Sequence, residues 1–124
     1  MCHRAAEGGQ LEVLKWLRKK GCVWDSKTCS WAAYEGHFEL LIWAHNNDCP
    51  WDESTCSSAA LGGHLQILKW LRENGCPWNS ETCASALNTQ HIEIFLWARE
   101  SGCEISSTTR SKIKVKYPEL QYLL

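Results

Sequence analysis

Apolar and polar positions follow a pattern along this chain that recurs every 27 residues. In residues 28–54, one segment over about residues 29–35 stops at Gly36. A second segment over about residues 37–47 carries apolar side chains on a broad face: Phe38, Leu40, Leu41, Trp43 and Ala44. So broad a face is expected of a helix with neighbours on both sides. Each copy of the pattern is therefore predicted to form two short helices.

Residues that cap or break helices mark the ends of these segments. Thr28 is a predicted N-cap, and Gly36 is a predicted stop because glycine adopts positive φ without strain. A Cys-Pro-Trp turn follows the second helix, and its proline makes the turn rigid. An Asx turn or cap is expected at the residues that lead the chain into each following helix: Asp25, Asp52 and Asn79.

Several residue types share the 27-residue step, which identifies the copies as structural repeats. All eight cysteines follow the step, as do the tryptophans of the second helices and of the turns: Trp16, Trp43, Trp70 and Trp97, and Trp24, Trp51 and Trp78. A unit of this size cannot bury its apolar faces alone, so the units must stack. We expect both series of tryptophans to be buried and to dominate the stability of the stack.

These patterns predict an all-α solenoid of stacked helix-turn-helix units in a single domain over residues 1–124. The units span about residues 1–27, 28–54, 55–81 and 82–108, with Met1 opening the first, and a C-terminal capping unit covers residues 109–124. Residues 111–117 alternate lysine with apolar residues, which taken alone indicates a strand. Their place in the repeat instead predicts a first helix, and Pro118 then opens a half-helix that ends at Leu124.

The composition is that of a globular protein, with 44% apolar and 22% charged residues. No stretch approaches the roughly 18 apolar residues of a membrane span, and Met1 leads into the repeats without a signal peptide. We expect a monomeric cytoplasmic protein, with the nucleus as the alternative address, and no membrane partner. Charge is uneven, because residues 28–54 hold five acidic residues and neither lysine nor arginine, which would steer a charged partner.

The cysteines allow three interpretations. Disulfides need an oxidising compartment, which no other feature of the sequence indicates. Small buried thiols that pack like apolar side chains are the preferred interpretation. The third is a zinc site in each unit, built from a set such as Cys22, Cys29 and His37, although the sequence has no close Cys-x-x-Cys pair. A metal-binding, and in particular zinc-binding, repeat protein is therefore the alternative function.

Features of enzymes and of nucleic-acid-binding proteins are sparse. The sequence has no glycine-rich phosphate loop, no acid and base at a suitable spacing and no nucleophile motif, so we expect neither catalysis nor a cofactor. Its one basic stretch runs from Lys112 to Lys116, which is too little for a basic face at a net charge of −1. We accordingly expect no nucleic-acid partner.

One unit resembles a known repeat. Residues 55–65 read Thr-Cys-x-x-Ala-Ala-x-x-Gly-His-Leu, and residues 68–76 read Leu-Lys-Trp-Leu-Arg-Glu-Asn-Gly-Cys. They resemble the ankyrin repeat, and most of all the cysteine- and tryptophan-rich ankyrin-like arrays of protists and large DNA viruses. The period here is shorter than the usual ~33 residues, and the Thr-Pro-Leu-His start is absent. The projecting β-finger between units is therefore expected to shrink to the Cys-Pro-Trp turn.

The resemblance implies a scaffold that binds a protein partner on the concave face of its first helices. It also implies that the histidines of the Gly-His pairs tie helix starts to nearby backbone: His37, His64 and His91. Candidate partner-binding residues are the positions that vary among the units. Each unit has two of them, three residues apart on one helix face: Arg4 and Glu7, Trp31 and Tyr34, Ser58 and Leu61, Ser85 and Asn88.

Trp31 and Tyr34 are the strongest of these candidates. They are large aromatic residues at positions where the other units hold residues such as serine or leucine, and aromatic residues dominate binding hot spots. The alternative is that Trp31 packs over Arg4 or over a helix end, because single aromatic residues at a surface are common.

Overall fold

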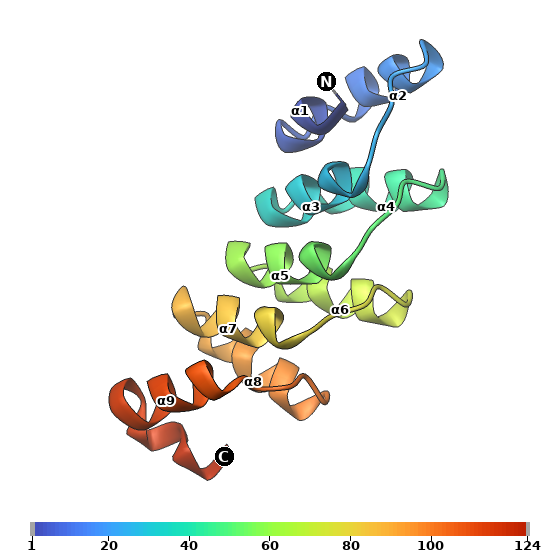
Figure 1. Cartoon of the computed structure of the whole chain (residues 1–124). Helices are drawn as coiled ribbons and strands as arrows, with labels where there is room; N and C mark the ends of the chain where they lie inside the picture. The colour runs from blue at the N-terminus through green and yellow to red at the C-terminus, as the bar shows by residue number, and fades with distance from the viewer. Residues whose placement is uncertain (1, 124) are drawn as a thin grey trace.

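The chain folds into pairs of helices that stack in the order of the sequence (Figure 1). The computed structural model describes residues 2–123, so the expectations for Met1 and Leu124 fall outside the described residues. Residues 2–123 contain α-helices and one 3-10 helix, and no strand. The predicted all-α solenoid is confirmed. None of these helices has the length and apolarity needed to cross a membrane.

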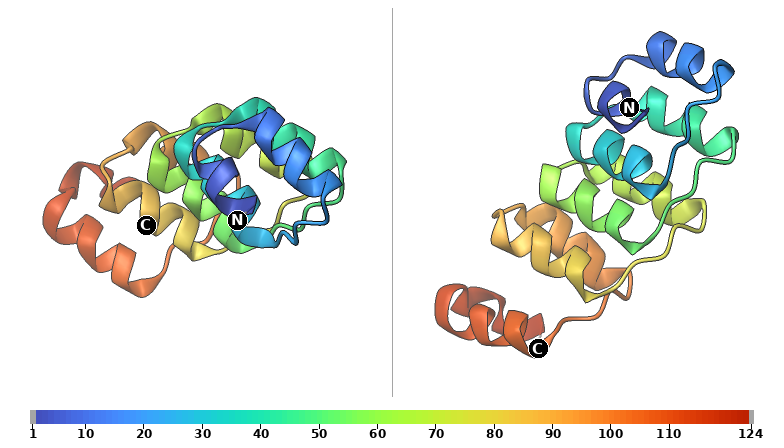
Figure 2. Two further views of the ribbon diagram at one scale, coloured as in Figure 1. Left: turned by 90° about the horizontal axis from the view of Figure 1, so that it is seen from above. Right: turned by 45° about the horizontal axis from the view of Figure 1, so that its top comes forward.

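Each repeat contributes a first and a second helix. The first helices are α1 (Cys2–Glu7), α3 (Ser26–Glu35), α5 (Glu53–Gly62), α7 (Ser80–Asn88) and α9 (Ser107–Lys116). The second helices are α2 (Leu11–Lys19), α4 (Phe38–Asn46), α6 (Leu65–Glu73) and α8 (Ile92–Glu100), and the 3-10 helix η1 (Pro118–Leu123) follows α9. First helices form one layer and second helices another, and an extended linker carries the chain back to each following first helix (Figure 2).

The first helices begin earlier than predicted because an Asx side chain, and not a threonine, caps them. The Asp25 carboxylate accepts a hydrogen bond from the Lys27 backbone N–H at 3.0 Å. In the next repeat, Asp52 forms a capping box with Thr55, whose hydroxyl accepts from the Asp52 backbone N–H at 3.3 Å. An Asx side chain reaches the amides of the first turn, which leaves Thr28 buried inside that turn. The prediction of Thr28 as the cap is wrong, and the expected Asx caps are confirmed.

The core lies between the two layers of helices. First helices contribute mostly small side chains and second helices contribute mostly large ones, and this pairing lets the layers approach closely. In the two central repeats the fully buried apolar residues of the helices are Cys29, Ala32, Ala33, Cys56, Ala59 and Ala60 from first helices, and Leu41, Ala44, Leu68 and Leu71 from second helices.

The tryptophans lie at the surface of the stack, contrary to the prediction that they are buried. Trp16 is 58% exposed, and the other tryptophans of the second helices are half-buried. Leucines such as Leu41 and Leu68 already fill the interior, so the larger indoles lie outside it. Each turn tryptophan meets the helix tryptophan of the next repeat edge to face, with ring centroids 5.7, 5.8 and 5.8 Å apart: Trp24 and Trp43, Trp51 and Trp70, Trp78 and Trp97.

Candidate binding surface

The repeated histidines connect neighbouring repeats. His37 Nε2 lies 2.8 Å from the backbone oxygen of Glu7, and His64 Nε2 lies 3.0 Å from that of Tyr34, in each case in the preceding repeat. His91 forms its hydrogen bond within its own repeat. Since each of these histidines is the N-cap residue of a second helix, His37 and His64 tie a helix start to backbone, as the resemblance implied.

The cysteines pair in a way that separates the predicted zinc ligands. The hydrogen bond with Cys49, together with burial, raises the pKa of the Cys29 thiol, and the Cys49 thiol donates to the backbone oxygen of Asp25 at 3.6 Å. Cys29 is therefore paired with Cys49 and not with Cys22 and His37. Protonated thiols are poor metal ligands, and residues 2–123 hold no cluster of three or more His, Cys, Asp or Glu side chains placed to bind a metal ion.

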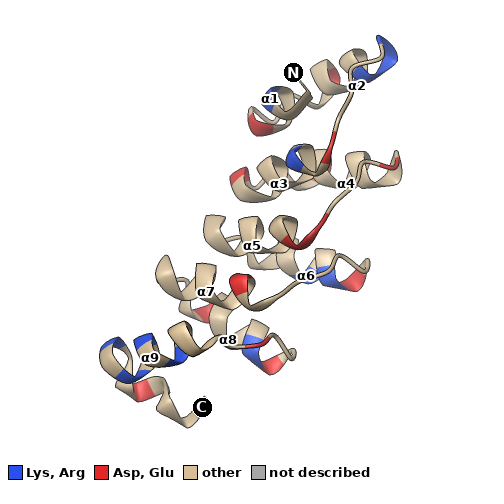
Figure 3. Ribbon diagram, in the orientation of Figure 1, with Lys and Arg blue, Asp and Glu red and all other residues tan. Residues whose placement is uncertain are grey.

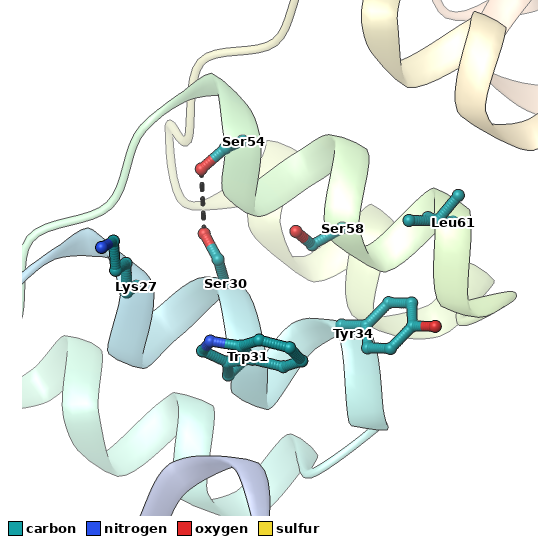
Figure 4. Close-up of a pocket in the computed structure, with 7 residues that line it drawn as sticks. All are labelled: Lys27, Ser30, Trp31, Tyr34, Ser54, Ser58 and Leu61. Carbon is teal, nitrogen blue, oxygen red and sulfur yellow. Dashed lines mark hydrogen bonds between the residues drawn. The ribbon is translucent and has the colours of Figure 1, made fainter. Parts of the chain in front are cut away.

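Trp31 lies between two hollows on the first helices. Between α3 and α5 is a cavity of about 290 Å³, which we call the aromatic cavity (Figure 4); its lining is Lys27, Ser30, Trp31, Tyr34, Ser54, Ser58 and Leu61. Between α1 and α3 is a second hollow, of about 630 Å³, which we call the charged hollow; its lining is His3, Arg4, Glu7, Gly8, Trp31 and Glu35. A partner that crosses the first helices would therefore contact Trp31 from either side.

Two aromatic rings form one wall of the aromatic cavity. The ring centroids of Trp31 and Tyr34 are 5.9 Å apart and their planes meet at 81°, which is a favourable edge-to-face arrangement. Trp31 is half-buried, whereas Tyr34 and Leu61 are 38% and 41% exposed. Arg4 lines the charged hollow with Trp31, but no cation–ring contact joins the two within the described chain. Apolar surface is thus open to a partner at the mouth of this cavity.

Two of the eight candidate residues lie outside both hollows. Ser85 is half-buried on α7. The side-chain oxygen of Asn88 accepts a hydrogen bond from Lys112 Nζ of α9, which joins the fourth repeat to the terminal unit. The other six candidates line one hollow or the other: Arg4, Glu7, Trp31, Tyr34, Ser58 and Leu61.

Three residues that line the aromatic cavity were not among the candidates predicted from the sequence. Lys27 lies one helical turn before Trp31, so helical spacing could have identified it. Ser30 and Ser54 bridge α3 and α5, with their hydroxyl oxygens 3.0 Å apart. Ser54 occupies the position in its repeat that Lys27 occupies in the preceding one. Only the register in which two repeats stack brings it to the cavity, and the pattern within one repeat does not give that register.

Charged side chains are unevenly distributed over the stack (Figure 3). Acidic residues mark the linkers that enter α3 and α5, and basic residues lie at the end of α2 and along α9. The basic residues of α9 are Arg110, Lys112, Lys114 and Lys116. Lys27 is the charged residue in the lining of the aromatic cavity, so that cavity differs in charge from the acidic linkers beside it.

Comparison with protein families gives one match. A family model described as ankyrin repeats (many copies) matches residues 29–72, which run from α3 into α6 and include Trp31 and Tyr34. A search of curated proteins finds no match. The matched residues cover most of the two helix pairs on either side of the aromatic cavity.

Solved structures share the fold, with 47 matching chains. Among them are two crystal structures of the pentatricopeptide repeat protein PPR10 in complex with an 18-nt psaJ RNA element, one of them carrying three cysteine-to-serine substitutions. Each matches at 14% sequence identity and a TM-score of 0.52, and each alignment covers 90% of this chain. This chain spans only 20% of the PPR10 chain. At such identity the likeness shows the fold alone.

These neighbours contradict the expectation that the chain has no nucleic-acid partner. The expectation depended on the low net charge of −1 and on the short basic stretch near Lys112, whereas the PPR10 structures contain a helical-repeat protein bound to RNA. Helical repeats can read single-stranded bases through a few side chains in each repeat. Net charge alone therefore does not exclude RNA for a chain of this architecture.

Proposed function

We propose that this chain, which belongs to the ankyrin-like repeat proteins, is a non-enzymatic scaffold that binds a protein partner on the surface of α1, α3 and α5. Ankyrin repeats generally mediate contacts between proteins, which supports the proposal. The observation that carries it is the edge-to-face pair of Trp31 and Tyr34 at the mouth of a cavity between two repeats.

The physical case is the concentration of apolar surface at one place. Aromatic side chains that are held rigidly beside a cavity contribute most of the binding energy in many interfaces. Stacked repeats present such residues on an extended surface that several segments of a partner can contact. Trp31 and Tyr34 stand at positions where the other repeats hold smaller side chains.

We place this function in the cytoplasm. Seven of the eight cysteines are buried as free thiols inside the stack. Such thiols are typical of a reducing compartment. Oxidative modification would introduce bulk where the layers pack most closely.

The test is affinity capture of the full chain from extracts of its native cells, followed by mass spectrometry. We expect a double variant, Trp31→Ala with Tyr34→Ala, to lose the captured partner while circular dichroism shows an unchanged helical content. Trp16→Ala is the matched control, because it removes an exposed tryptophan that does not line the cavity. Equal capture by the double variant and the parent chain would contradict the proposal.

RNA is the second candidate partner, and the fold shared with PPR10 favours it. Nucleobases stack on aromatic side chains such as Trp31 and Tyr34, so the same surface serves both candidates. Capture is therefore repeated after ribonuclease treatment of the extract. Partners that persist after treatment and depend on Trp31 support direct protein binding, whereas partners that disappear support binding through RNA.

A further inference from the structure

We propose that the aromatic cavity binds a segment of a protein partner in which a large apolar side chain stands next to a carboxylate. This inference rests on the proposed function and specifies its chemistry. The cavity of about 290 Å³ has the size for one large side chain together with a neighbouring acidic group. One end of the cavity is apolar and the other carries hydrogen-bond donors, and together they indicate which ligand the cavity suits.

One end of the cavity is apolar. Tyr34 of α3 and Leu61 of α5 lie at this end, opposite Lys27, with the ring of Trp31 between the two ends (Figure 4). Tyr34 and Leu61 are partly exposed and contribute apolar surface that an incoming side chain would cover. Burial of this surface favours an aromatic or large aliphatic side chain.

The other end of the cavity presents two hydrogen-bond donors that no protein acceptor occupies. The indole nitrogen of Trp31 lies on the edge of its ring nearer to Lys27 (Figure 4). Within residues 2–123 neither this N–H nor the exposed Lys27 ammonium donates to another protein group, and the one ion pair joins Lys15 to Glu12. An indole N–H and an ammonium can only donate, so the group they suit is an acceptor.

The remaining polar groups leave few acceptors for a cationic ligand. Ser30 and Ser54 are hydrogen-bonded to each other at 3.0 Å, and the Ser54 hydroxyl also donates to the Asp52 carboxylate at 2.5 Å. Ser58 can donate as well as accept. No acidic side chain lines the cavity, and its one charged lining residue is Lys27. Charge complementarity therefore favours an anion, and a carboxylate is the anion that proteins supply without modification.

The test uses two small probes of nearly equal shape and opposite charge, phenylpropionate and phenylethylamine. Each is titrated into the full chain, and proton–nitrogen NMR follows the indole signal of Trp31, which is assigned from its loss in Trp31→Phe. We expect phenylpropionate to bind about fivefold more tightly, the scale of a partly exposed charge-assisted hydrogen bond. Equal affinities, or a preference for the amine, would overturn the proposal.

Two variants show whether Lys27 is the source of the preference. We expect Lys27→Gln to bring the affinity ratio of the two probes to about one, while binding of the aromatic ring itself persists. Lys19→Gln removes an exposed lysine from α2, outside the cavity lining, and we expect it to keep the fivefold ratio. A ratio that survives in Lys27→Gln would overturn the assignment of the anion to this end of the cavity.

A third probe, adenosine monophosphate, distinguishes a peptide from a nucleotide. It carries an aromatic base with a phosphate, so it suits an apolar surface beside a cation as well. Weaker binding than phenylpropionate supports the peptide carboxylate. Tighter binding that Lys27→Gln removes would overturn it in favour of a nucleic-acid ligand.

Capture with the Lys27 and Trp31 variants separates the carboxylate assignment from the scaffold function. If capture of the partner needs Trp31 and Tyr34 but is unchanged in Lys27→Gln, the scaffold function stands and the carboxylate assignment is wrong. If capture is unchanged in the Trp31 and Tyr34 double variant, the binding surface itself is wrong. A loss of capture in Lys27→Gln, with circular dichroism unchanged, supports both proposals.

Discussion

A single glycine position fixes the spacing between neighbouring repeats. Gly36 ends α3 with φ of 83°, and a Cβ built at this residue would lie 2.6 Å from Cε1 of His64 in the next repeat. The position thus requires a left-handed backbone and also an absent side chain. In the fourth repeat Gln90 replaces the glycine, with φ of 62°, and Pro118 stands where the next histidine would be. Glycine is lost where the histidine that packs on it is lost.

Gln90→Gly is expected to stabilise the chain. A residue with a Cβ in the left-handed region is strained by roughly 1 kcal/mol, and glycine removes that strain. Urea denaturation followed by circular dichroism measures the change in the free energy of unfolding. Gly75→Ala is the matched control, because its φ is 82° and nothing lies within 4 Å of the added Cβ. We expect Gly75→Ala to lower the free energy of unfolding by a similar amount. A lower free energy of unfolding in Gln90→Gly would show that the glutamine side chain makes stabilising contacts.

The cap of α5 should make stability depend on pH. The hydrogen bond from the Ser54 hydroxyl lowers the pKa of the Asp52 carboxyl below its ordinary value of 3.8. A pKa that is lower in the folded chain stabilises it at pH values above the ordinary pKa. This stabilisation is lost as the pH falls through the ordinary value to the lower folded value.

Asp52→Asn tests this dependence with a residue that the chain already uses, since Asn79 caps α7 in the same way. The amide keeps the hydrogen bond to the Ser54 backbone N–H but does not titrate. We expect the urea midpoint of the variant to fall less than that of the parent chain between about pH 5 and pH 2. Identical slopes for the two chains would show that Asp52 does not contribute.

At the scale of helices, Trp70 should contribute far more to stability than Trp16. Trp70 is half-buried on α6 and meets Phe38 and Trp51 edge to face, each with ring centroids 5.8 Å apart. Trp16 occupies the same position on α2 but is 58% exposed. We expect Trp70→Ala to reduce the free energy of unfolding by about 3 kcal/mol, at the low end for a large aromatic side chain. Trp16→Ala should reduce it by less than about 1 kcal/mol, and equal losses would contradict a packing role for the ring contacts.

The repeating pattern predicted the helix pairs but not where they begin or what they bury. Thr28 and Asp25 are both good capping residues, and only the folded backbone decides between them. The position of the tryptophans also depends on how the two layers of helices pack, because Leu41 and Leu68 fill the space between the layers. The proximity of Trp31 and Tyr34 was predicted from their helical spacing, and their role in partner binding stays a prediction. The cavity beside the pair was not predicted, because its other wall, with Ser54, comes from α5, the first helix of the next helix pair.

For the molecule as a whole, one thiol should report on the integrity of the stack. Cys22 is half-buried, and the other seven cysteines are buried. Burial and the hydrogen bond with Cys22 raise the pKa of Cys2 to about 11, which keeps that thiol protonated and unreactive at neutral pH. We expect a thiol reagent to modify one cysteine of the folded chain rapidly and all eight after denaturation. Cys22→Ser should remove the rapid phase, and rapid reaction of several thiols would contradict the buried arrangement.

The packing of first helices against one another also determines how the molecule responds to force. Contacts run from α1 to α3, from α3 to α5 and from α5 to α7, so the interfaces between repeats are connected in series along the stack. Tension applied at the two ends would load every interface equally, and the weakest would yield first. Each repeat released in this way would lengthen the chain by up to about 90 Å, the extended length of its residues. The end-to-end length of the protein under tension should therefore increase in steps, one for each repeat that unfolds.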